Sequence, residues 1–287
     1  MTIKEMWDCA TETLLYFIQI MPDVPFTEDD IIIEFVPQKD IVERYKELRD
    51  KYCPERIVND SQFQDLAVNA KGNAIIGREK SAVIVCIDRK QDTDNLRRIM
   101  FHEYMHIYCA KTEIDGEHFI DIYGTGTTPE RGGDFDIYDG QLASGYDIWE
   151  EFIAHYYSFK YTEKRKYAFS TLELEYIFDL LSDIVADNMY AKGSLSYVCA
   201  ILLTCTDADK ILENLKTPNF IYSDDNPNGK IARVAFSNCL SHLYSQMQKE
   251  KPWKINEPFI SEIGGKYTWF AAINSIYLGM VKRHKNL

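Results

Sequence analysis

The sequence lacks an apolar run long enough to cross a bilayer, and it is short of positive charge. Its longest apolar stretches, such as residues 197–203, fall far below the roughly 20 residues that a membrane-spanning helix needs. Lysine and arginine number 32 against 45 aspartates and glutamates, which gives a formal net charge of −13. An acidic chain repels nucleic-acid phosphates and anionic lipids. We therefore expect no membrane and no nucleic acid among the partners of this protein.

The chain also lacks any C-x-x-C pair. Its seven cysteines are odd in number, and several sit inside apolar runs such as residues 83–86. A disulfide framework or a cysteine zinc cluster would show paired spacings. The pattern therefore predicts reduced, buried thiols in a cytoplasmic protein.

What the chain has is an ordinary globular composition, with 46% hydrophobic and 27% charged residues among its 287 residues. That length allows one large domain or two. The first half mixes helical and strand patterns, whereas the residues after about 165 show only helical spacing. We expect an α+β fold. Residues 1–165 would form a domain with a small antiparallel or mixed sheet. Residues 166–287 would form a helical domain that packs against the cleft of this first domain.

Individual elements follow from capping residues, β-branched runs and breaks at proline or glycine. In the first half we expect two helices, over residues 3–21 and 39–51, and three strands, over residues 31–36, 74–77 and 81–88. The last two strands are predicted to pair antiparallel. In the second half, a capping box formed by Ser170 and Glu173 begins one helix. A break at Gly264 and Gly265 precedes the last of four further helices, predicted over residues 193–205, 207–216, 230–248 and 266–284.

Residues 124–145 contain six of the fourteen glycines. Long irregular segments in compact domains are usually functional or disordered. The segment lacks the G-K-[ST] ending of a phosphate-binding loop. We expect it to form a mobile rim over the site that the next motif predicts.

Residues 99–108 contain the pattern H-E-x-x-H, formed by His102, Glu103 and His106. Residues four apart lie on the same face of a helix, so the two imidazoles can bind one metal ion. Zinc accepts neutral imidazole nitrogens and keeps a position open when the protein supplies only three ligands. Glu103 would then take a proton from a zinc-bound water as general base. Asp92, Thr93 and Asp94 are candidates for the N-cap of this helix.

The surroundings of this motif favour a metal site over two ordinary core histidines. Between residues 99 and 109 the only charged side chain is Glu103, apart from histidines that gain a proton, so the helix is expected to be buried on most sides. Burying polar groups costs free energy unless they are paired or bind a ligand. The alternative, a helix with two hydrogen-bonded core histidines, explains the Glu between them less well.

A second helix is predicted over residues 146–157. Glu151 and His155 lie four residues apart, on a face separate from its apolar stripe. That stripe consists of Trp149, Phe152, Ile153 and Tyr156. Glu151 is therefore the favoured third ligand, with Glu150 as the competitor.

The motif helix resembles the active-site helix of the zincin metallopeptidases, and the second helix resembles that of their gluzincin branch. In gluzincins a Glu of the second helix is the third zinc ligand, and a small residue follows three positions later, which Glu151 and Ala154 match. The next position is often an Asp that orients a ligand histidine; here it is His155. Its side chain would hydrogen-bond one of the metal-binding residues, bind the metal as a fourth ligand, or have a purely structural role. The resemblance also implies that the strand within residues 82–88 runs beside the cleft and pairs with extended substrate, although an ordinary core strand fits these residues equally well.

The sequence thus predicts a cytoplasmic zinc metallopeptidase with one Zn²⁺ per chain, held by His102, His106 and Glu151, that hydrolyses a peptide or protein substrate. Glu103 is the catalytic residue that activates water. Two alternatives remain open: a catalytically silent zincin-like scaffold that binds a protein partner, and a zinc hydrolase that acts on a non-peptide amide.

Overall fold

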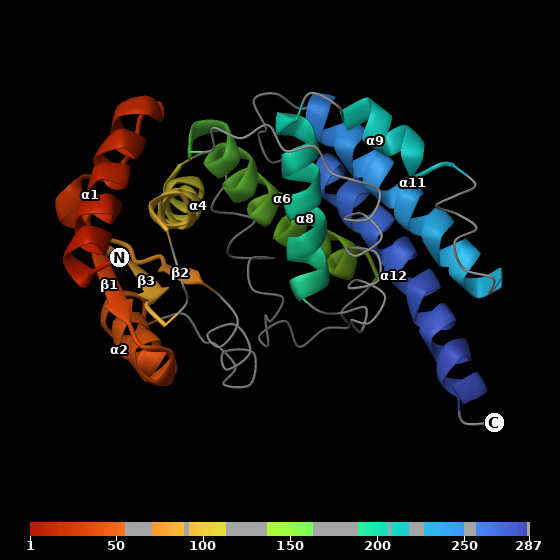
Figure 1. The fold of residues 1–287 in the computed structure, drawn as a ribbon, viewed down its shortest axis with the longest axis horizontal. Coiled ribbons are helices and arrows are strands. Elements are labelled where there is room, and N and C mark those ends of the chain that lie inside the picture. Colours follow the sequence, from red (N-terminus) through yellow and green to blue (C-terminus); the bar gives the residue numbers. More distant parts are fainter. Residues whose placement is uncertain are drawn as a thin grey trace. The chain divides into compact units, whose positions relative to one another are not determined.

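The computed structural model describes residues 1–54, 71–88, 92–112, 137–162, 189–205, 208–217, 227–249 and 257–285. In these residues the fold is α+β, as predicted, and mostly helical, with eight α-helices and one small sheet (Figure 1). The chain divides into two compact units: residues 1–113 with 157–164, and residues 114–156 with 165–287. The predicted domain boundary at 165 lies outside the described residues and stays a prediction.

The sheet of the first unit has three strands in the order β1-β3-β2, with β1 Ile31–Val36, β2 Gly72–Ile75 and β3 Ser81–Cys86. β2 and β3 pair antiparallel, which confirms the expected pair of neighbouring strands, and β1 pairs parallel with β3. β3 is the central strand, and each of its six residues is buried. Residues 81–86 therefore form an ordinary core strand, which was the alternative to a strand that pairs with substrate. Because β1 and β2 occupy both of its edges, β3 has no edge left to pair with a substrate.

One face of the sheet is covered by α2 (Ile41–Tyr52). Side chains of alternate strand residues form a hydrophobic core with this helix, as the period of two in a strand requires. The core contains Val36, Ile41, Leu48, Cys53, Ile75, Ala82, Ile84 and Cys86. On the same face, Arg44 of α2 hydrogen-bonds Glu34 of β1 and Glu47.

The opposite face is covered by α1 (Ile3–Ile20) and α4 (Thr93–Lys111), which pack against each other. Figure 1 shows α1 and α4 on one side of the strands and α2 on the other. The ring centroids of Phe17 in α1 and Phe101 in α4 lie 4.8 Å apart. The Tyr104 hydroxyl donates to the Ala10 carbonyl at 3.1 Å. α4 is thus held between α1 and the sheet, which fixes the helix that carries H-E-x-x-H.

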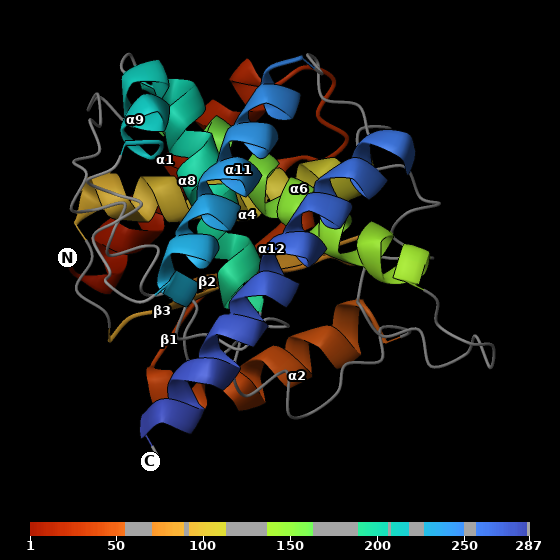
Figure 2. The same cartoon turned by 90° about the vertical axis from the view of Figure 1, so that its right-hand side faces the viewer.

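The described residues of the second unit are helical. Its described helices are α6 (Ile137–Thr162, whose residues from 157 on group with the first unit), α8 (Met189–Thr204), α9 (Ala208–Asn214), α11 (Pro227–Lys249) and α12 (Glu257–Lys285). The four expected helices of this half are present, with shifted ends, and Figure 2 shows α11 and α12 running side by side. The helix expected from the capping box at Ser170 lies outside the described residues.

Two predictions that rested on glycine were wrong. Residues 137–145 are not an irregular loop but the first turns of α6, and the expected break at Gly264 lies inside α12. A Cβ at Gly145 would overlap the Ile260 carbonyl oxygen, and a Cβ at Gly264 would overlap that of Gln141. The two glycines let the backbones of α6 and α12 touch, so their role is close packing rather than a turn. The remaining part of the expected rim, residues 124–136, lies outside the described residues.

The cysteines agree with the sequence prediction. None of the seven forms a disulfide, and six are buried, with Cys205 partly exposed. In the part of the chain that the structure describes, no helix combines the length and the apolarity that a membrane crossing requires.

Candidate metal centre

The helix α4 begins where its sequence signals a start. The Asp92 side chain, one of the expected N-cap candidates, accepts a hydrogen bond from the Asn95 amide at 2.8 Å. From residue 99 to residue 109 every α4 side chain is buried except that of His102, which is partly buried. Glu103 is 6% exposed and His106 is 9% exposed. The motif therefore lies on a helix that is enclosed on most sides, as its uncharged flanks predict.

His102 and His106 point toward each other from successive turns of α4. Their Nε2 atoms lie 3.0 Å apart, and the rings meet edge to face at 82°. Two nitrogens that each bind one tetrahedral zinc at about 2.0–2.1 Å lie about 3.3 Å apart. The two imidazoles are thus close to the geometry that a shared metal ion needs, without any change in the helix.

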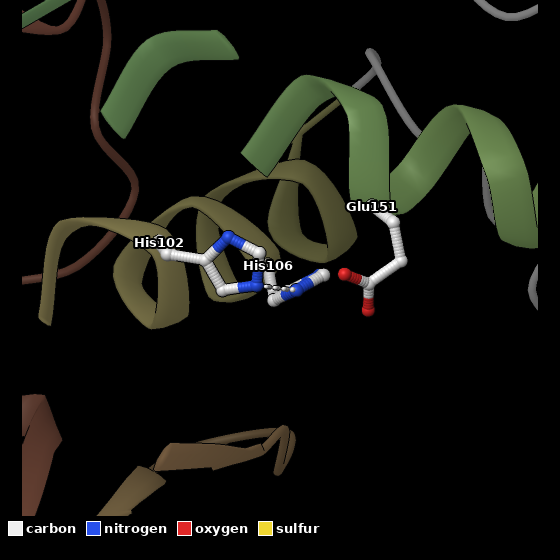
Figure 3. Close-up of side chains that lie close together, drawn as sticks. All are labelled: His102, His106 and Glu151. Carbon is white, nitrogen blue, oxygen red and sulfur yellow. Dashed lines mark hydrogen bonds between the residues drawn. The ribbon is translucent and has the colours of Figure 1, made fainter. Parts of the chain in front are cut away.

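Glu151 of α6 completes the group. One ligand atom from each of His102, His106 and Glu151 lies within 4.8 Å of the other two, and Figure 3 shows the Glu151 carboxylate directed at the imidazoles. These are the three residues that the sequence predicted as ligands, whereas the competitor Glu150 does not belong to the cluster. The cluster can hold a metal ion, since imidazole nitrogen and carboxylate oxygen are both metal ligands.

Helical spacing explains why Glu151 and not Glu150 takes this position. The neighbouring Trp149, Phe152 and Ile153 are all buried, so the apolar stripe of α6 faces a core as predicted. Towards the end of α6, Tyr161 packs on Phe101 of α4 with ring centroids 5.6 Å apart.

His155 lies one turn beyond Glu151. Its Nε2 is 3.6 Å from Glu151 Oε2, and its ring meets the Tyr197 ring of α8 edge to face, with centroids 5.2 Å apart. The imidazole therefore lies next to the Glu151 carboxylate, longer than a hydrogen bond but close enough that a small shift would let it donate a proton that orients the carboxylate. The sequence pointed to His155 but not to Tyr197.

Glu103 of α4 lies against the backbone of β2 at Gly72. A Cβ at Gly72, the first residue of β2, would stand 3.0 Å from Glu103 Oε1 and 2.8 Å from Ile99 Cγ2. The strand backbone thus closes directly over the carboxylate. No sequence signal near residue 72 indicates this contact, because it joins residues about 30 positions apart.

Comparisons of the chain with protein-family models, with curated proteins and with solved structures found no match.

Proposed function

We propose that the chain is a zinc-dependent metallopeptidase of the gluzincin type that acts on a peptide or protein. The observation that carries this proposal is the donor cluster of two imidazoles and one carboxylate. Three ligands of these types suit a catalytic zinc, which keeps one position for water or substrate. When bound, zinc would polarise a carbonyl group and lower the pKa of a water molecule.

Glu103 is the proposed general base. It adjoins His102 in α4 but is turned about 100° around the helix axis, and it is not a member of the cluster. Its carboxylate would take the proton of the attacking water and pass it to the leaving amine. The burial of Glu103 limits exchange of that proton with bulk solvent.

The edge of β2 favours a peptide over a small amide as substrate. The Cys86 amide donates to the Lys71 carbonyl at 3.1 Å, so residues 71, 73 and 75 direct their backbone groups at β3. Gly72 and Ala74, in between, direct theirs to the other side, where no described strand pairs with them. An extended peptide can add to such an edge through backbone hydrogen bonds. Because Gly72 also borders Glu103, a peptide in that place would run past the proposed base.

The test compares the zinc-loaded protein with its Glu103→Gln variant on a diverse peptide library. Glutamine keeps the size of the side chain and its hydrogen bonding but removes the base. The variant should fold, keep its zinc and bind peptide, while turnover falls by about two to four orders of magnitude.

Unchanged turnover in Glu103→Gln would exclude the proposed mechanism. Peptide binding by the zinc-loaded wild type without any cleavage would favour a silent scaffold instead. Cleavage of amides other than peptides, with no peptide cleaved, would move the assignment to a non-peptide hydrolase.

A further inference from the structure

Gly72 stands where any side chain would meet the motif helix. Its φ lies outside the left-handed region, so alanine would fit the backbone conformation without strain. Glycine inside a strand is unfavourable on its own account, because it costs conformational entropy and packs no side chain. The reason for a glycine at residue 72 is therefore space and not a backbone angle.

The space is taken by two side chains of α4. An added Cβ would be 2.8 Å from Ile99 Cγ2, which is closer than real Cβ contacts, and 3.0 Å from Glu103 Oε1. Ile99 is buried and β-branched, so its χ1 angle in a helix is nearly fixed. The end of the Glu103 side chain is the part that can move.

We propose that Gly72 is a positioning residue for Glu103: the bare backbone of β2 sets where the carboxylate lies, and a side chain at residue 72 would displace it. This inference rests on the proposed function, in which Glu103 is the base. It gives β2 a second role besides its place in the sheet, because the strand then fixes the base as well as bordering the substrate.

The expected consequence is a loss of turnover without a loss of metal. Gly72→Ala pushes the carboxylate away from its position but leaves His102, His106 and Glu151 in place. A misplacement of about 1 Å can cost a hundredfold in rate, so kcat should fall about tenfold to a hundredfold. Zinc affinity should stay that of the wild type. Gly193→Ala in α8 is the matched control, because a Cβ there meets nothing within 4 Å.

A double-mutant cycle separates this positioning effect from general damage. Glu103→Ala removes both atoms of this side chain that a Cβ at residue 72 would meet, Oε1 at 3.0 Å and Cγ at 3.2 Å. Gly72→Ala should therefore cost much less in the Glu103→Ala background than in the wild type, since contacting residues are coupled. If Gly72→Ala alone does not fold, the same cycle is run in the Ile99→Ala background, which removes the 2.8 Å contact and keeps the 3.0 Å contact.

A second readout keeps the inference testable without turnover. Acetohydroxamate chelates a metal ion and needs a neighbouring base for its proton, so its affinity for the zinc-loaded protein also reports the position of Glu103. We expect weaker binding in Gly72→Ala and the same coupling to Glu103→Ala. A zinc-loaded wild type that binds acetohydroxamate but cleaves no substrate would refute the proposed function alone. Independent, additive effects of the two substitutions on acetohydroxamate affinity would overturn the role of Gly72, whether or not the protein is an enzyme.

Discussion

The imidazole of His155 lies 3.6 Å from the Glu151 carboxylate, one helical turn further along α6. If His155 orients the carboxylate by a donated proton, His155→Ala should lower zinc affinity about tenfold to a hundredfold, measured by competition with a chelator. An affinity equal to that of the wild type would leave His155 a purely structural role. A loss as large as that of His102→Ala would make it a fourth ligand.

The two neighbouring glutamates of α6 should behave differently. Glu151→Ala removes a carboxylate of the cluster and should abolish most of the zinc affinity, whereas Glu150→Ala should leave it unchanged. The pair is a matched control, since both substitutions remove one negative charge from the same helix. The reverse outcome would show that the helix is out of register by one residue at the site.

The histidines of α4 provide the most direct test of the metal site. The wild type should carry one zinc per chain by elemental analysis, and His102→Ala and His106→Ala should carry none. Zinc should also raise the stability of the wild type, by about 2.7 kcal/mol at a hundredfold excess over Kd. His242→Ala is the control, because His242 lies outside the cluster, with its Nε2 3.0 Å from Glu262 Oε1. Unchanged zinc content in both α4 variants would rule out the site.

Gly264 and Gly265 are neighbours in α12 with opposite expected responses to alanine. A Cβ at Gly264 would overlap the Gln141 carbonyl oxygen of α6, and a backbone atom cannot move aside cheaply. We expect Gly264→Ala to lower the free energy of unfolding by about 3 kcal/mol or more. A Cβ at Gly265 has its nearest neighbour at 3.7 Å, and alanine favours a helix by about 1 kcal/mol over glycine. Urea denaturation should therefore show Gly265→Ala as stable as the wild type or more so. Equal losses in both would refute the close crossing of α6 and α12.

The buried phenol of Tyr104 should make the free energy of unfolding depend on pH in the alkaline range. Burial raises the pKa of the Tyr104 phenol well above its ordinary value of 10.0. Above pH 10 the unfolded chain therefore releases this proton while the folded chain keeps it. The contribution of Tyr104 to stability is complete below pH 10 and is lost as the pH rises further.

Tyr104→Phe should accordingly be less stable than the wild type at pH 7, by about 1 kcal/mol for the lost hydrogen bond to Ala10. The difference should shrink as the pH rises above 10, since phenylalanine has no proton to lose. Thermal unfolding of both proteins from pH 7 to 11 measures it. A constant difference across that range would mean that the phenol ionises equally in both states.

Several features could be predicted from the sequence because their causes are local. His102 and His106 share a face of α4 through the four-residue spacing, and Asp92 caps that helix through its own side chain. The antiparallel pair β2–β3 joins strands separated by only a few residues. The choice of Glu151 over Glu150 likewise followed from the phase of one helix.

Other features depend on contacts between distant parts of the chain, which no local pattern records. The sequence gives β3 a run of apolar residues, but its central position required β1, about 50 residues earlier, to pair with it. The glycine pattern misled for the same reason at Gly264, which was expected at a break but permits a close approach to α6. Likewise, no local pattern shows that Gly72 leaves room for Glu103. Glycine marks a turn when its backbone angle matters and a close contact when its missing side chain matters. The sequence by itself determined which residues of this protein are able to bind a metal ion, and only the tertiary structure decided that a strand backbone lies against the proposed base.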